Sequence, residues 1–345
     1  MHLLKYIAPQ PNSYLAPMKA LNTLTKISFL TGTALLAYAW GGERPQMHLR
    51  RYRLLWTGNA RLKILHLSDQ HFGRTDWVQR LRFRQLSVML PQLKPDIIFL
   101  TGDFLHDNEG LPAVARLLSL LPPAPLGRYA VLGNHDYAVY SYSELFRNMA
   151  QSISEVATPE RKISTITNEM RTLGQLALDI YKNDRLRFAA VPNNTKKLIH
   201  LLEAHDVTLL RNNARALPGL PEIWVVGVDD LVEGNPDLEA AMAQIPSNAH
   251  TILLTHNPDL AYEPAAQRVE LIFAGHTHGG QVVLPGLGAI HTQGTRLPRH
   301  KAAGHFNNLP GRGQMIVSRG MGESTPLRLG APPEVVWVEI HPKSN

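Results

Sequence analysis

Short apolar runs and longer helical patterns alternate along most of the chain. Apolar runs of this length, bounded by polar or turn-forming residues, are typical of buried strands. We expect strands at residues 63–67, 96–100, 129–132, 223–228, 251–256, 271–276, 314–318 and 334–340. Apolar positions at helical spacing predict helices over residues 77–93 and 111–121. The alternation predicts an α/β fold.

Polar clusters follow five of these predicted strands directly. In an open α/β sheet, side chains beyond the carboxyl ends of several strands can converge on one ligand. The candidates are Asp69, His71, Asp103, Asn134, His135, Asp136, His256, His276 and His278. Each alone has an ordinary explanation, such as an Asp that caps a helix or an Asn in a turn. Together, at five strand ends, they indicate a shared metal centre.

The segment "GHTHGG" at residues 275–280 strengthens this interpretation. Each imidazole can coordinate a metal through one ring nitrogen, and the flanking glycines permit tight backbone conformations. The chain contains no cysteine, so His, Asp, Glu or Asn must hold any metal. The candidate ligands exceed what one ion needs, and we expect two divalent cations bridged by a carboxylate. Manganese is our first expectation, while iron, zinc and cobalt also suit this ligand set.

Five sequence blocks carry a family resemblance. "SDQH", "TGDF", "GNHD", "LTHNP" and "GHTH" occur in this order and closely resemble the signature of the calcineurin-like metallophosphoesterases. The resemblance implies a four-layer double β-sandwich flanked by helices, which spans residues 61–340. Because no signature residue is missing, it also implies an active, metal-dependent hydrolase of phosphoric esters or pyrophosphates.

The same resemblance implies a role for each candidate residue. It assigns Asp69, His71 and His278 to one ion and Asn134, His256 and His276 to the other, with Asp103 bridging them. His135 would contact the phosphate and protonate the departing oxygen, and Asp136 would orient His135.

An apolar segment, "ISFLTGTALLAYAW" at residues 27–40, lies between Lys26 and Glu43. As a helix its uncharged run reaches about 24 Å, against about 30 Å for a bilayer core. We interpret it first as a marginal spanning helix or an interfacial membrane anchor. A cleaved signal peptide and a buried core helix are the alternatives.

The basic charge of the chain is concentrated near its N-terminus. The formal net charge is +7, and residues 1–60 hold seven Lys and Arg against Glu43 alone. The rest is therefore nearly neutral, which predicts weak binding to nucleic acid. The arginines after the apolar segment favour the cytoplasmic face of the inner membrane, and export is the alternative. We divide the chain into an anchor or signal-like segment with a basic linker, residues 1–60, and a metallophosphoesterase domain, residues 61–340.

The segment at residues 141–192 reads as an insertion beside the metal site. Two stretches with apolar positions on one helical face predict a helical hairpin. One hypothesis is a surface decoration that buries its apolar stripes against itself or against the main body of the domain. The other is a lid with an apolar groove for acyl chains, and with Arg147, Arg171 or Lys182 near the phosphate.

The substrate is addressed by a second resemblance. The helical insertion and the apolar N-terminus together resemble two groups, the membrane-associated bacterial phosphoesterases and the UDP-2,3-diacylglucosamine hydrolases of lipid A synthesis. The closing segment "SRGMGESTPLRLGAPPEVVWVEI" resembles that of the first group. This implies a lipid-linked pyrophosphate that yields 2,3-diacylglucosamine 1-phosphate and UMP, with the membrane surface as a partner. The alternatives are a broad-specificity phosphodiesterase or nuclease, and a membrane-tethered binding protein without activity. The sequence gives no prediction of oligomeric state.

Overall fold

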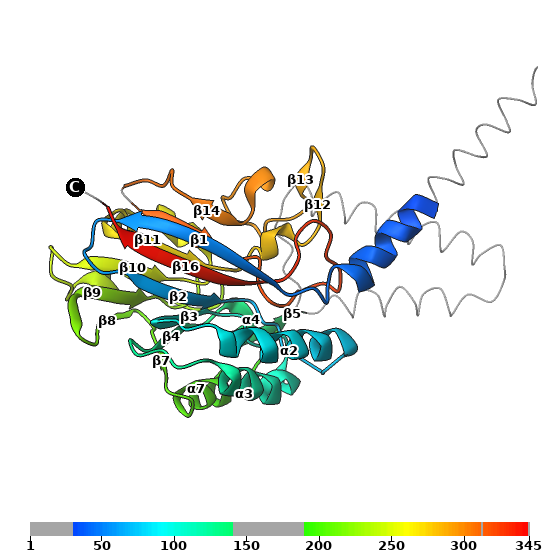
Figure 1. The fold of residues 1–345 in the computed structure, drawn as a ribbon, viewed down its shortest axis with the longest axis horizontal. Coiled ribbons are helices and arrows are strands. Elements are labelled where there is room, and N and C mark those ends of the chain that lie inside the picture. The colour runs from blue at the N-terminus through cyan, green and yellow to red at the C-terminus, as the bar shows by residue number, and fades with distance from the viewer. Residues whose placement is uncertain (1–29, 141–189, 312, 344–345) are drawn as a thin grey trace, which may run out of the picture.

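Two six-stranded β-sheets form the centre of the molecule (Figure 1). The computed structural model describes residues 30–140, 190–311 and 313–343. The first sheet has the strand order β1 (His48–Trp56), β16 (Glu334–Pro342), β2 (Leu62–Leu67), β3 (Ile97–Thr101), β4 (Arg128–Val131) and β7 (Val207–Leu209). The second has the order β14 (Gly304–Phe306), β15 (Gln314–Val317), β11 (Leu271–Ala274), β10 (His250–Leu254), β9 (Leu220–Gly227) and β8 (Asn213–Leu217).

Helices cover the outer face of each sheet and complete four layers. On the first sheet lie α2 (Trp77–Met89), α3 (Leu111–Leu120) and α7 (Thr195–Glu203), as Figure 1 shows. On the second lie α8 (Leu238–Met242) and the short helices η4 (Pro258–Tyr262) and η5 (Pro264–Arg268). The mixed α/β fold and its layers therefore agree with the expected double sandwich.

Strand β3 shows why short apolar runs predicted these sheets. Ile97 and Phe99 pack between the two sheets, whereas Ile98 and Leu100 pack against the helices. Successive side chains point to opposite faces, so a strand buried on both faces must be apolar throughout. All eight expected strands and both expected helices are present, with shifted ends.

Parallel pairing gathers the polar clusters at one end. Strand β3 is parallel to β2 and β4, and β10 is parallel to β9 and β11. The loops that follow β2, β3, β4, β10 and β11 therefore emerge at the same end of the sandwich.

Strand β1 lies inside residues 1–60, the segment that sequence analysis assigned to an anchor and linker. It pairs in parallel with β16 at the edge of the first sheet. Its three arginines, Arg50, Arg51 and Arg53, are exposed. Charged side chains are a common feature of edge strands, and here they conceal the strand's apolar pattern.

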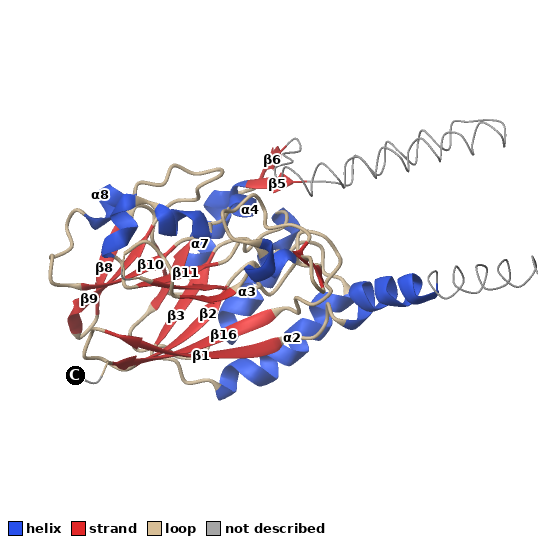
Figure 2. Cartoon of the chain, turned by 90° about the horizontal axis from the view of Figure 1, so that it is seen from above, coloured by secondary structure: helices blue, strands red, loops and turns tan. Residues whose placement is uncertain are grey.

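The apolar N-terminal segment is described from residue 30 onward. Residues 30–37 are helical and continue into the π-helical turn η1 (Tyr38–Gly42), which projects from one end of the molecule (Figure 2). Leu36 and Trp40 are 63% and 52% exposed. Among the described helices, none has the length and apolarity needed to cross a membrane.

The predicted helical hairpin at 141–192 lies almost wholly outside the described residues. The structure does describe the strands at its two ends, β5 (Ala138–Tyr140) and β6 (Ala190–Pro192), which pair antiparallel. Tyr140 lies directly opposite Ala190, so the chain leaves and rejoins the domain at neighbouring positions.

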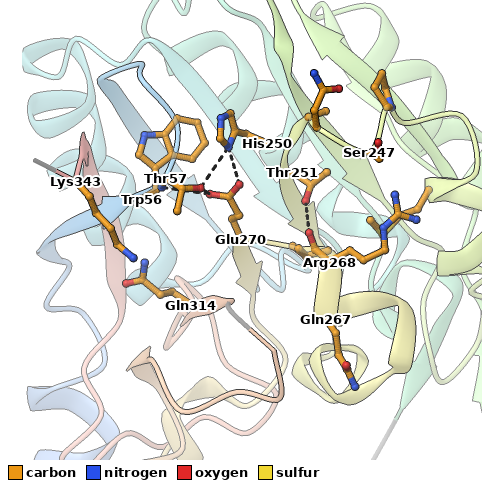
Figure 3. A pocket seen from close by; sticks show the side chains of 15 residues that line it. Trp56, Thr57, Ser247, His250, Thr251, Gln267, Arg268, Glu270, Gln314 and Lys343 are labelled. Atoms are coloured by element: carbon orange, nitrogen blue, oxygen red, sulfur yellow. Dashed lines mark hydrogen bonds and ion pairs between the residues drawn. The ribbon is translucent and has the colours of Figure 1, made fainter. Parts of the chain in front are cut away.

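At the opposite end of the strands, three side chains tie the sheets together (Figure 3). Thr57, which follows β1, donates through Oγ1 to Glu270 Oε2 at 2.6 Å. His250, at the start of β10, lies with Nδ1 2.6 Å from Glu270 Oε1. These residues line a cavity of about 560 Å³, to which no predicted site residue contributes.

Candidate metal centre

The structure brings all nine predicted site residues to one end of the sandwich, on five separate loops, and every one is buried. Asn134, His135 and Asp136 begin the short helix α4 (Asn134–Tyr137) directly after β4. His278 begins the short 3-10 helix η6 (His278–Gly280), and the other five lie in loops. Five of these six residues have positive backbone φ angles: Asp69 (51°), His71 (45°), Asp103 (53°), His276 (71°) and His278 (51°). Such conformations are rare outside glycine and concentrate at functional sites.

The first group of donor atoms comprises Asp69, His71, Asp103 and His278. Their potential ligand atoms all lie within 4.8 Å of one another. His71 Nε2 is 3.2 Å from Asp103 Oδ2, and His278 Nε2 is 3.7 Å from Asp69 Oδ1.

The second group comprises Asp103, His256 and His276, again within 4.8 Å. His256 Nε2 lies 3.2 Å from Asp103 Oδ2 and 3.2 Å from His276 Nδ1. Asp103 therefore belongs to both groups, and its carboxylate lies between them.

Backbone carbonyls set the orientation of two of these imidazoles. His256 Nδ1 lies 2.7 Å from the carbonyl oxygen of Thr101, and His276 Nε2 lies 3.3 Å from that of Gln293. A carbonyl can only accept, so each of these nitrogens carries the proton and the other ring nitrogen presents its lone pair to the site. Burial lowers the pKa of His276 to about 3, which keeps its ring neutral and able to ligate a metal.

Several buried polar atoms in the site have no hydrogen-bond partner among the described residues. They include both ring nitrogens of His71, Nδ1 of His278 and Oδ1 of Asn134. A buried polar atom without a partner is destabilising by about 1–3 kcal/mol. His71 Nε2 is close to Asp103 but not aligned for a hydrogen bond, as expected of two ligands that face one cation. The mixed nitrogen and oxygen donors therefore fit divalent cations.

Asp136 has a different environment from the expected one. Its carboxylate accepts hydrogen bonds from the backbone N–H groups of Asp103 (2.8 Å), Gly133 (2.9 Å) and Leu105 (3.1 Å). It is the third residue of α4, and such a carboxylate turns back toward the helix start. Burial, with the nearby Asp103 charge, raises the pKa of Asp136 to about 7. Asp136 thus fixes the loop that carries Asp103 and does not hold the His135 ring.

His135 faces the first group of donors. Its ring centroid lies 4.4 Å from that of His71 and 4.8 Å from that of Tyr140. Its Nδ1 has no hydrogen-bond partner in the part of the chain that the structure describes. Burial lowers the pKa of His135 well below its ordinary value, and His71 adds to the effect. The neutral ring still carries one N–H that can donate to a phosphoryl oxygen.

Sequence reasoning missed several groups in this site. The Thr101 and Gln293 carbonyls leave no side-chain signal. His106 was missed because it lies outside the family signature, although it follows Asp103 in the same loop. Its ring stacks on His135 with centroids 6.1 Å apart. A histidine three residues after a candidate ligand could have suggested it.

Comparison with known proteins identifies the family of the chain. Residues 62–280, which contain all five signature blocks, match the family model described as calcineurin-like phosphoesterase. An uncharacterised metallophosphoesterase of Aquifex aeolicus is 30% identical over 82% of this chain and 87% of its own length. The UDP-2,3-diacylglucosamine pyrophosphatase LpxG of Chlamydia trachomatis is 25% identical over 90% of this chain and 94% of its own length.

A third relative, the uncharacterised metallophosphoesterase YkuE of Bacillus subtilis, is 26% identical over 84% of this chain and 82% of its own length. Each of these likenesses extends over more than four fifths of this chain. The chain belongs to the calcineurin-like phosphoesterase family and is a metal-dependent hydrolase of phosphoric esters or pyrophosphates.

Proposed function

We propose that this protein hydrolyses UDP-2,3-diacylglucosamine to UMP and 2,3-diacylglucosamine 1-phosphate, a step of lipid A biosynthesis. The observation that carries the proposal is the likeness to LpxG, which extends over 94% of the length of that enzyme and 90% of this chain. A likeness of this extent includes the segments outside the five signature blocks. One water molecule is consumed, and one P–O bond of the pyrophosphate is broken.

Within this proposal, the two donor groups hold one divalent cation each, with manganese first. We assign Asp69, His71 and His278 to one cation, Asn134, His256 and His276 to the other, and Asp103 to both. Bound there, the cations would supply an activated water and neutralise charge on the phosphoryl oxygens.

Side chains of the protein then position the phosphoryl group and donate a hydrogen bond to its oxygens. The ring N–H of His135 donates to a phosphoryl oxygen or to the departing oxygen. Asp136 accepts hydrogen bonds from two backbone N–H groups of the Asp103 loop, which keeps the shared carboxylate in place. Burial of the site excludes bulk water and strengthens these electrostatic interactions.

We also propose that the protein acts at a membrane surface, on the cytoplasmic face of the inner membrane. The support is the helical segment that the structure describes from residue 30 onward, whose Leu35, Leu36 and Trp40 side chains are exposed. The ring of Trp40 lies 5.7 Å from that of Trp77, at the start of α2. Exposed aliphatic and aromatic side chains of this kind partition into the bilayer interface.

Product analysis tests the substrate proposal. The purified protein is incubated with UDP-2,3-diacylglucosamine and Mn²⁺, and UMP and the lipid monophosphate are quantified by mass spectrometry. Asp103→Asn removes the shared charge and should lower the rate by about a thousandfold or more. Asp206→Asn is the matched control, because Asp206 is an exposed Asp with a similar φ of 56°.

Two outcomes would count against the proposal in different ways. If the protein cleaves a generic phosphodiester and leaves the lipid substrate intact, the hydrolase assignment stands and the lipid substrate is wrong. If Asp103→Asn retains full turnover, the shared carboxylate is not part of the site.

A further inference from the structure

A cleft of about 300 Å³ opens directly beside the metal ligand His71. One wall is the first part of α2, and the other is the loop at residues 321–326. Phe72, Phe83 and Leu86 contribute an apolar floor, and His106 forms part of the edge next to the metal centre. A group attached to a phosphate in the metal centre would therefore lie next to this cleft.

Two glutamine side chains in the cleft lack the hydrogen bonds that buried amides require. Gln70 and Gln79 are only 3% and 9% exposed, and neither Oε1 atom has a hydrogen-bond partner among the described residues. The Nε2 atom of Gln70 makes only a long contact, 4.0 Å, with the sulfur of Met321. Unpaired buried amides are uncommon in folded proteins and call for a bound partner.

His106 adds a third hydrogen-bonding group at the inner end of the cleft. Its ring is partly buried, and its potential ligand nitrogen lies within 4.8 Å of those of His71 and His135. Among the residues that the structure describes, no hydrogen bond to its ring is found. His106 therefore lies at the end of the cleft that is nearest the metal centre.

The charged side chains around the cleft largely neutralise one another. Glu323 accepts a hydrogen bond from Arg44 Nη2 at 2.8 Å and another from Arg82, and its Oε2 lies 3.7 Å from Arg328 Nε. Arg74 also lines the cleft, and its positive charge is offset by the carboxylates of Asp76 and Asp107. The cleft thus offers amide and imidazole groups to a ligand and little net charge.

We propose that this cleft is the subsite for an uncharged, hydroxyl- and amide-bearing sugar linked to the metal-bound phosphate. An amide side chain offers both a donor and an acceptor, which matches sugar hydroxyl groups and an acylated amine. The apolar floor suits the C–H face of a sugar ring. The inference rests on the proposed function, in which the phosphate carries an acylated glucosamine, and it assigns Gln70, Gln79 and His106 to sugar recognition.

Calorimetric binding of two phosphate monoesters tests this subsite without turnover. N-acetylglucosamine 1-phosphate and ethyl phosphate are titrated into the Mn²⁺-loaded full chain. Two to three hydrogen bonds to the sugar should make N-acetylglucosamine 1-phosphate bind at least about tenfold more tightly than ethyl phosphate. Gln79→Met, which keeps the length of the side chain, should reduce this ratio to about three or less. Gln92→Met, at an exposed glutamine just beyond α2, is the control.

His106→Asn provides an independent variant if Gln79→Met perturbs the start of α2. Equal affinities of the wild type for the two esters would overturn the subsite, and so would a ratio that neither variant lowers. A separate result bears on the proposed function. Sugar-dependent binding without release of UMP from the lipid substrate would preserve the subsite and refute the proposed reaction.

Discussion

Asp103 and four other candidate ligands adopt a backbone conformation that residues with side chains rarely adopt. Each left-handed residue is destabilising by about 1–2 kcal/mol relative to ordinary conformations. The buried, unpaired nitrogens of His71 add to this cost. We therefore expect the site to be less stable without cations than with cations bound between its donor atoms.

Removal of metal should therefore lower the stability of the fold. A cation at about a hundred times its dissociation constant stabilises a protein by about 2.7 kcal/mol, so chelation should reduce the Tm by about 5 °C or more. Differential scanning calorimetry with EDTA and with Mn²⁺ measures the change. Asp103→Asn should show a much smaller shift, and an unchanged Tm in the wild type would contradict the metal interpretation.

Glu323 gives a prediction about pH. Burial alone would raise the pKa of Glu323, but Arg82, Arg328 and Arg44 outweigh it and hold the pKa below its ordinary value of 4.5. A lowered carboxyl pKa contributes stability above pH 4.5, and this contribution is lost as the pH falls through the folded-state pKa.

Glu323→Gln should lower the free energy of unfolding at pH 7 by about 3–5 kcal/mol, because it leaves buried arginines without their counter-charge. Urea unfolding at pH 7 and pH 4 measures this loss, and the variant should lose less stability than the wild type between the two values. The exposed Glu222→Gln serves as the control. A variant as stable as the wild type at pH 7 would show that the cluster contributes nothing.

At the scale of elements, the sequence predicted the strands that are buried on both faces. Strand β3 is apolar at every position before its last residue, and its pattern leaves no alternative. Strand β1 was missed because arginines occupy its exposed edge positions. Strand β8, which contains Asn213 and Arg215, was missed for a similar reason, since half of it is open to solvent.

The candidate site was predictable where its chemistry depends only on the types of its residues and their order along the chain. Aspartates and histidines after strand ends identified the donor groups. The backbone contacts of Asp136 follow from its position in α4, which residue order alone does not reveal. The cleft residues Gln70 and Gln79 lie on different elements, and only the packing of α2 beside the loop after β2 brings them together.

The contact between Thr57 and Glu270 offers a test of how the two sheets are joined. Thr57→Val should lower the free energy of unfolding by about 1 kcal/mol, because it removes one side chain-to-side chain hydrogen bond. Glu270→Ala should lower it further, because it also removes the contact with His250. In a double-mutant cycle, the two effects should couple by at least about 0.5 kcal/mol. Hydrolysis should be unchanged, since this contact lies at the strand ends opposite the metal centre. Strictly additive effects would show that the two residues do not interact in solution.

At the scale of the whole molecule, the exposed apolar helix and the proposed sugar cleft are adjacent. Arg44 lines the cleft and lies two residues after the end of η1, whose Trp40 contacts Trp77 of α2. An amphiphile with its acyl chains in a bilayer could therefore place its head group in the cleft while the helix lies at the interface.

Vesicle sedimentation tests this arrangement. Combined Leu36→Ser and Trp40→Ser should weaken binding of the full chain to phosphatidylglycerol vesicles by about tenfold, because two apolar side chains no longer enter the interface. Leu287→Ser is the matched control, since Leu287 is 62% exposed on a different part of the surface. Equal loss in the control would indicate nonspecific adsorption.

The pairing of Tyr140 with Ala190 has a consequence for how such enzymes diversify. A two-residue Asn-Gly turn can close an antiparallel pair of this kind. Replacing residues 141–189 with that turn should leave a chain that folds and binds Mn²⁺ with the same stoichiometry, as measured by elemental analysis. The β5–β6 hairpin would then accept different segments between its two strands, while the loops that carry the metal ligands keep their positions.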